Sequence, residues 1–90
     1  MDALDGNAIA GTLFEAFGGE MTTAVAACAS CGTTGHLAEY AVYRGGPGVV
    51  VRCRHCENIA MVLVEVGGRI CVDAMGLSAL RPPADRLLSR

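Results

Sequence analysis

Apolar residues recur at helical spacing near the beginning of the chain. Over residues 5–17 they lie three and four positions apart, which predicts a helix with a single apolar stripe. The stripe contains Ile9, Ala10, Leu13, Phe14 and Phe17. Asp5 is a candidate N-cap, and Gly18-Gly19 supplies a C-terminal stop. The stripe must be covered, either by this domain's own sheet or by another chain.

Short β-type segments separated by glycine follow from residue 21 onward. Gly45, Gly46 and Gly48 predict a turn over residues 44–48, and Gly67-Gly68 predicts a two-residue hairpin loop. The tail from Arg81 has no predicted element, and we expect it to be disordered. Five strands are predicted, over residues 22–27, 36–43, 49–52, 59–66 and 69–73.

The length of 90 residues allows one small domain with a marginal core. There is no Trp, and the net charge is −2. All seven basic residues are arginines that follow residue 43, a composition that we attribute to a GC-rich bacterial genome. The acidic start is unlike a secretory signal, and no apolar run is long enough to span a bilayer. We therefore expect a cytoplasmic protein without a membrane segment.

Four cysteines form the strongest pattern in the sequence. Cys28-x-x-Cys31 and Cys53-x-x-Cys56 are separated by 21 residues, enough for one strand, a turn and a returning strand. Each Cys-x-x-Cys turn, called a knuckle below, places two sulfurs within reach of one ion. Zinc prefers four tetrahedral ligands, and thiolates suit it. The sequence therefore predicts one Zn²⁺ per chain.

A site closed by four protein ligands has no open position for water or substrate, which is typical of structural zinc. Two other interpretations of these cysteines stay open. They could hold a single iron ion and transfer electrons, or they could form two disulfides. In a cytoplasmic protein, metal ligation is favoured over disulfides.

The alternation of knuckle and hairpin resembles the zinc-ribbon superfamily. The resemblance is carried by Cys28-Ala29-Ser30-Cys31-Gly32 and Cys53-Arg54-His55-Cys56. With the helical leader Asp5-Gly6-Asn7-Ala8-Ile9-Ala10-Gly11, the whole chain is also similar to a short actinobacterial-type zinc-ribbon family of unknown function. The first resemblance implies a small mostly-β (α+β) fold, with two knuckle-hairpins after an N-terminal helix. It implies no activity, because zinc ribbons serve many functions.

We divide the chain into a helical leader over residues 1–20, a zinc-ribbon domain over 21–80 and a tail over 81–90. Cys71, in the middle of a predicted strand, is interpreted as a small core residue rather than a redox thiol or replacement ligand. His55 is expected to be exposed near the sulfurs, and His36 to be a terminal residue of a strand, at its beginning.

No enzyme motif is present. The glycine-rich turn lacks the Lys and Ser/Thr of a phosphate loop. The leading hypothesis is therefore a non-enzymatic interaction module that binds an unknown protein or a second copy. Its surface would be a sheet edge or the apolar helix stripe, formed by Ile9, Leu13, Phe14 and Phe17. A less favoured alternative is a nucleic-acid-associated regulator whose basic residues converge near the second knuckle, namely Arg44, Arg52, Arg54 and Arg69.

Overall fold

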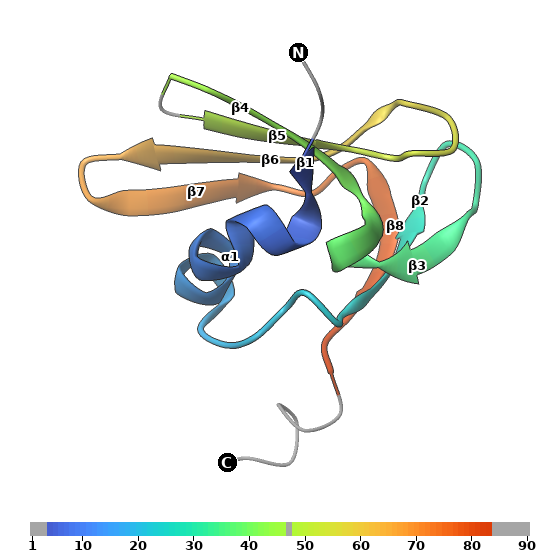
Figure 1. Ribbon diagram of the computed structural model, residues 1–90, viewed down its shortest axis with the longest axis horizontal. Coiled ribbons are helices and arrows are strands. Elements are labelled where there is room, and N and C mark those ends of the chain that lie inside the picture. Colours follow the sequence, from blue (N-terminus) through green and yellow to red (C-terminus); the bar gives the residue numbers. More distant parts are fainter. Residues whose placement is uncertain (1–3, 47, 84–90) are drawn as a thin grey trace.

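Two antiparallel sheets and one short helix make up the structure, a computed structural model that describes residues 4–46 and 48–83 (Figure 1). The larger sheet has five strands in the order β1-β4-β5-β6-β7. The predicted small, mostly-β fold with an N-terminal helix is confirmed. The strands of this sheet are β1 (Leu4–Asp5), β4 (Ala41–Gly45), β5 (Gly48–Arg52), β6 (Ile59–Val66) and β7 (Arg69–Asp73).

The smaller sheet has three strands in the order β3-β2-β8. They are β2 (Val25–Cys28), β3 (Thr34–His36) and β8 (Leu77–Arg81). In Figure 1 this sheet lies beside the larger one, and the segment that leaves β7 crosses over to form β8. Loops therefore make the covalent connections between the two sheets, and both sheets also contribute residues to one core.

The N-terminal helix begins with a 3₁₀ turn, η1 (Gly6–Ile9), and continues as α1 (Ala10–Phe17). Asp5 caps it as predicted, because its Oδ1 accepts a hydrogen bond of 3.1 Å from the Asn7 N–H. Gly18 ends it with a φ of +74°, and the Gly18 N–H donates to the Phe14 carbonyl. α1 contacts β7, and η1 contacts β4, so the helix packs against the larger sheet.

The strands predicted over residues 59–66 and 69–73 match β6 and β7, and Gly67-Gly68 connects them with positive φ at both residues. The strand predicted over residues 22–27 begins later, at Val25, because Thr22 is held in a turn. Its hydroxyl donates to the Glu20 carboxylate at 2.7 Å, and this hydrogen bond lowers the pKa of Glu20.

The single strand predicted over residues 36–43 is wrong. A second 3₁₀ turn, η2 (Leu37–Glu39), separates β3 from β4. The Glu39 carboxylate accepts a hydrogen bond from the His36 N–H at 3.1 Å, which bends the chain at this point. The bend lets both Leu37 and Tyr40 enter the core, which a straight strand would not allow.

The prediction also missed β8, which lies partly in the segment assigned to the tail. Its residues pair with β2 through backbone hydrogen bonds, although no β-branched side chain marks the segment as a strand. The disorder predicted for the tail concerns all of residues 81–90, of which residues 84–90 lie outside the described residues. Arg81 itself ends β8.

One core lies between the helix and the two sheets. The helix stripe is divided by this packing: Ile9 and Leu13 are each 1% exposed, whereas Phe14 is 57% exposed. The interpretation of the stripe as an outer interface is therefore wrong for Ile9 and Leu13, because this chain's own sheet covers them. Phe17 packs partly buried against the same core. The buried apolar residues of the core include Met21, Val42, Val51, Met61 and Leu63.

Gly6 allows a close approach between the two 3₁₀ turns. A Cβ atom at this position would overlap the carbonyl group of Leu37. Residue 6 must therefore be glycine for η1 to contact η2. In the described ranges, 4–46 and 48–83, no helix combines the length and the apolar character that crossing a membrane requires.

The divided stripe makes a testable prediction. We expect Leu13→Ala to lower the free energy of unfolding by about 2–5 kcal/mol, because it leaves a cavity in the core. Phe14→Ala, the matched control one residue away, should cost less than about 1 kcal/mol because its side chain is exposed. Chemical denaturation measures both values. Equal losses for the two variants would contradict the packing described here.

Candidate metal centre

The two knuckles have nearly the same backbone geometry. In the first, the Gly32 N–H donates to the Cys28 carbonyl at 2.9 Å. In the second, the Glu57 N–H donates to the Cys53 carbonyl at 2.8 Å. Each turn ends with a left-handed residue, Gly32 with φ +76° and Glu57 with φ +66°. Glu57 adopts this conformation because it stands at the position equivalent to Gly32.

The knuckles face each other and bring four sulfur atoms together. The Sγ atoms of Cys28, Cys31, Cys53 and Cys56 all lie within 4.8 Å of one another. Two of these approaches are between the knuckles: 3.6 Å from Cys28 to Cys56, and 3.7 Å from Cys31 to Cys53. A disulfide would need about 2.05 Å between sulfurs, so these cysteines are free thiols. Four sulfurs at this spacing could hold a metal ion.

The cluster stands where the two sheets meet. Cys28 is the last residue of β2 in the smaller sheet, and Cys53 directly follows β5 in the larger sheet. Both are buried, whereas Cys31 is exposed and Cys56 is intermediate. An ion bound here would therefore connect the two sheets at a point where one side of the cluster faces the core and the other faces solvent.

The thiols differ in their electrostatic environment. Hydrogen bonds with the side chain and backbone of Thr33 lower the pKa of Cys31 to about 6. The Asn58 N–H favours a thiolate at Cys56, but burial and the neighbouring cysteines outweigh it and raise the pKa of Cys56 to about 11. Four thiolates this close together repel one another. A cation between them would remove this repulsion and allow all four to ionise.

Tyr40 forms part of the wall around the cluster. Its burial, followed by the charges of the nearby cysteines, raises the pKa of Tyr40 to about 12. No sequence pattern marks this residue as part of the site. Its position beside the cluster depends on the η2 bend, which interrupts the single strand predicted over residues 36–43.

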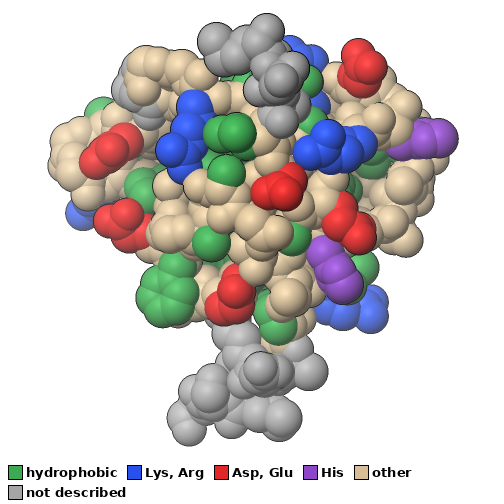
Figure 2. Space-filling model, in the orientation of Figure 1, with side chains coloured by type: hydrophobic (Ala, Val, Ile, Leu, Met, Phe, Trp, Pro, Cys, Tyr) green, Lys and Arg blue, Asp and Glu red, His purple; other side chains and the backbone are tan. Residues whose placement is uncertain are grey.

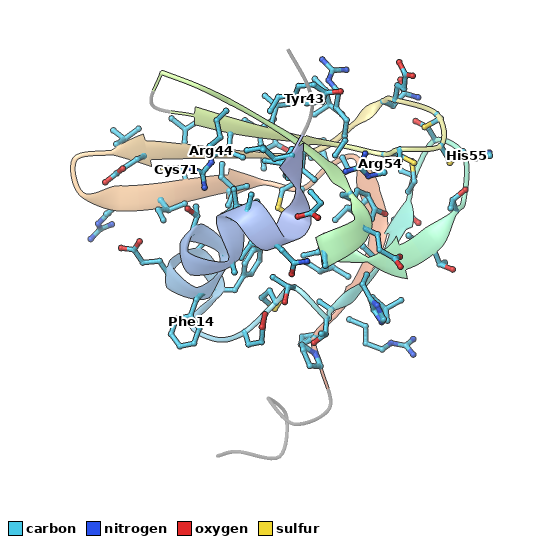
Figure 3. The ribbon with its side chains drawn as sticks, in the orientation of Figure 1. Phe14, Tyr43, Arg44, Arg54, His55 and Cys71 are labelled. Atoms are coloured by element: carbon cyan, nitrogen blue, oxygen red, sulfur yellow. The ribbon has the colours of Figure 1, made fainter. Side chains whose placement is uncertain are left out.

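The other candidate residues lie outside the cluster. His36 is the last residue of β3 rather than the first residue of a strand, and His55 is exposed and points away from the fold in Figure 3. Cys71 is neither a core residue nor one of the clustered thiols: it is exposed on β7, at the margin of the larger sheet. The interpretation of Cys71 as a buried apolar residue is therefore wrong, because Cys71 lies on the face of β7 opposite to Ile70, and Ile70 packs against the core.

The four arginines considered for nucleic-acid binding do not converge. The Arg54 guanidinium donates to the carbonyl groups of Glu39 and Leu4, at 2.8 and 3.3 Å. Arg44 donates to the Ala8 carbonyl from the helix-facing side of the larger sheet. These contacts tie the N-terminal segment to the rest of the fold.

The other two arginines lie at opposite ends of the larger sheet. Arg52 donates to the Glu57 carbonyl at 3.0 Å and lies over the Tyr43 ring. Arg69 pairs with Val66 beside the β6–β7 turn, whereas Arg52 pairs with Ile59 next to the second knuckle. The length of β6 separates these positions by roughly 23 Å. Arg69 is therefore remote from the second knuckle, whereas Arg52 and Arg54 line one hollow beside it together with Glu57.

Comparison with known proteins identifies the family of this chain. Residues 1–85 match the sequence pattern of a family of unknown function, DUF6510. The chain belongs to the DUF6510 family. No curated protein and no solved structure shows a significant match. The sequence resembles a family of unknown function, and DUF6510 is such a family. Membership in DUF6510 assigns no activity to the chain. The function of the chain therefore has to be inferred from the four-sulfur cluster.

Substitutions at Gly32 and Glu57 can test whether the left-handed conformation strains the backbone of each knuckle. Gly32→Ala should lower the free energy of unfolding by about 1–2 kcal/mol. The added Cβ has free space around it, so the loss comes from the backbone strain of an alanine with positive φ. Glu57→Gly should raise the free energy of unfolding by about 0.5–1 kcal/mol by relieving the same strain. Denaturation of the protein as purified measures both.

Glu57→Ala serves as the control, because it removes the carboxylate but keeps a Cβ in the left-handed conformation. The Glu57 contact with Arg52 uses the backbone carbonyl and survives both changes. If Glu57→Ala stabilised the protein as much as Glu57→Gly, charge rather than backbone strain would explain the effect.

Proposed function

We propose that this chain is a non-enzymatic interaction protein of the bacterial cytoplasm, and that one structural Zn²⁺ ion holds its fold. The observation that carries the proposal is the cluster of four sulfurs supplied by facing knuckles. Zinc bound to thiolates at about 2.3 Å in a tetrahedron requires sulfur–sulfur separations of about 3.8 Å. The separations of 3.6 and 3.7 Å between the knuckles agree with this requirement.

A structural role is favoured by the closed ligand set. When four cysteines complete the tetrahedron, no position is left for a water molecule or a substrate. The cluster also brings together β2 and β5, which belong to different sheets. A reducing compartment suits this arrangement, because it keeps free thiols available to the metal.

The energetic scale supports dependence of the fold on zinc. Structural zinc sites contribute about 10–16 kcal/mol of apparent binding free energy. A domain of this size has a total stability of about 5–15 kcal/mol. Removing the ion would therefore lower the free energy of unfolding by an amount comparable to the total stability of the domain. It would also leave four thiols close together at the junction of the two sheets.

An interaction role, rather than nucleic-acid binding, fits the distribution of charge. On the face shown in Figure 2, arginine side chains lie apart from one another, with acidic side chains between them. Four bound thiolates and one Zn²⁺ add negative charge to a chain whose net charge is already −2. A phosphate backbone would be repelled rather than attracted by this balance.

The zinc proposal is tested by elemental analysis and paired cysteine variants. Protein purified without added metal should contain one zinc per chain. Cys53→Ser should abolish both the zinc content and cooperative thermal unfolding, because a buried ligand is lost. Cys71→Ser is the matched control and should change neither, since Cys71 lies outside the cluster.

Iron in place of zinc, with a coloured protein, would assign the site to electron transfer instead. A metal-free chain that unfolds cooperatively would contradict a structural metal altogether. Cys53→Ser protein that kept one zinc per chain would show that the ion is bound elsewhere.

A further inference from the structure

The strands at the margins of the two sheets differ in how well they are protected from pairing with another chain. An unprotected margin exposes backbone N–H and C=O groups that can form a new ladder. β1 and β3 are only two and three residues long. β8 has an irregular register with β2, and Pro82-Pro83 follows it directly. These three margins carry the features that prevent edge pairing.

β7 lacks these features. It is five residues long, its register with β6 is regular throughout, and it contains no Pro or Lys. Its central residues, Ile70, Cys71 and Val72, are apolar, and Val72 is 37% exposed. A regular, apolar strand at the margin of a sheet is the kind of edge that pairs with another strand.

The backbone groups that β7 presents outward follow from its hairpin. The Gly67-Gly68 turn makes Val66 and Arg69 the closing hydrogen-bonded pair. Hydrogen-bonded and non-hydrogen-bonded pairs then alternate along the ladder. The N–H and C=O groups of Ile70 and Val72 therefore point away from β6, and they have no backbone partner among the described residues.

The charges at the ends of β7 are self-complementary. Arg69 begins the strand, Asp73 ends it, and Cys71 stands midway between them. In an antiparallel pair centred on Cys71, Arg69 lies opposite the partner subunit's Asp73, and Ile70 lies opposite the partner subunit's Val72. Opposite charges thus meet at both ends, and the outward N–H and C=O groups of Ile70 and Val72 meet in the centre.

We infer that β7 is a self-association surface, and that the partner it fits is a second copy of this chain. Two β7 strands pair in antiparallel fashion about a two-fold axis at Cys71 and join the two larger sheets into one. This inference rests on the interaction role proposed above and names its partner. A five-residue edge buries less area than a stable dimer interface, so we expect a dissociation constant of about 10 μM to 1 mM.

Charge exchange tests this register directly. Arg69→Asp alone and Asp73→Arg alone should each weaken dimerisation by about tenfold or more, because like charges then face each other at both ends. The double exchange, Arg69→Asp with Asp73→Arg, should restore dimerisation, because the pairs are re-formed with reversed sign. Arg81→Asp, which makes the same charge change at the margin of the smaller sheet, is the control and should have no effect.

A backbone variant tests the ladder itself. Val72→Pro removes an N–H that points away from β6, so the internal sheet should tolerate it while the pairing with a second copy is lost. Sedimentation equilibrium from about 20 μM to 2 mM, with zinc content measured for every variant, reports both properties.

A wild-type chain that stays monomeric over this range with its zinc bound would overturn the pairing and leave the zinc-stabilised module intact. A dimer that Val72→Pro leaves unchanged, or that the double exchange fails to restore, would place the contact elsewhere. Loss of zinc from the wild-type chain would instead be a failure of the proposed function.

Discussion

The convergence of four cysteine sulfurs at the junction of two sheets is the constraint on which the rest of this structure depends. Each sheet by itself is small, and one of them has only three strands. The chain crosses between them through loops, whereas the cluster brings the cysteine at the end of β2 close to the cysteine that follows β5. Such a connection matters in a chain of 90 residues, because a core this small gives little stability of its own.

The same junction explains several features that would otherwise look unrelated. Glu57 accepts a left-handed backbone because the second knuckle must turn as the first does at Gly32. Tyr40 is buried against the thiols because η2 bends the chain toward them. Arg54 uses its guanidinium to hold the carbonyl groups of Glu39 and Leu4, which fixes the N-terminal segment next to the second knuckle. The site is thus supported by backbone turns and by one buried ring, and its support extends to the first strand.

Sequence reasoning reached those parts of the fold that depend on local chemistry. The Cys-x-x-Cys spacing located the four clustered thiols, and β-branched runs with Gly67-Gly68 located the β6–β7 hairpin. It failed where tertiary contacts decide the outcome. The bend at η2 depends on a hydrogen bond between Glu39 and the His36 backbone, and β8 forms because β2 offers it a partner. The exposure of Cys71 and the division of the helix stripe depend on which face another element covers, and periodicity alone does not contain that information.

The most direct test of a zinc-centred fold is X-ray absorption spectroscopy at the metal edge, on protein purified without added metal. We expect a zinc edge and a single shell of four sulfur ligands at about 2.3 Å. An edge of another metal, or a first shell that includes nitrogen or oxygen in place of a cysteine sulfur, would contradict it.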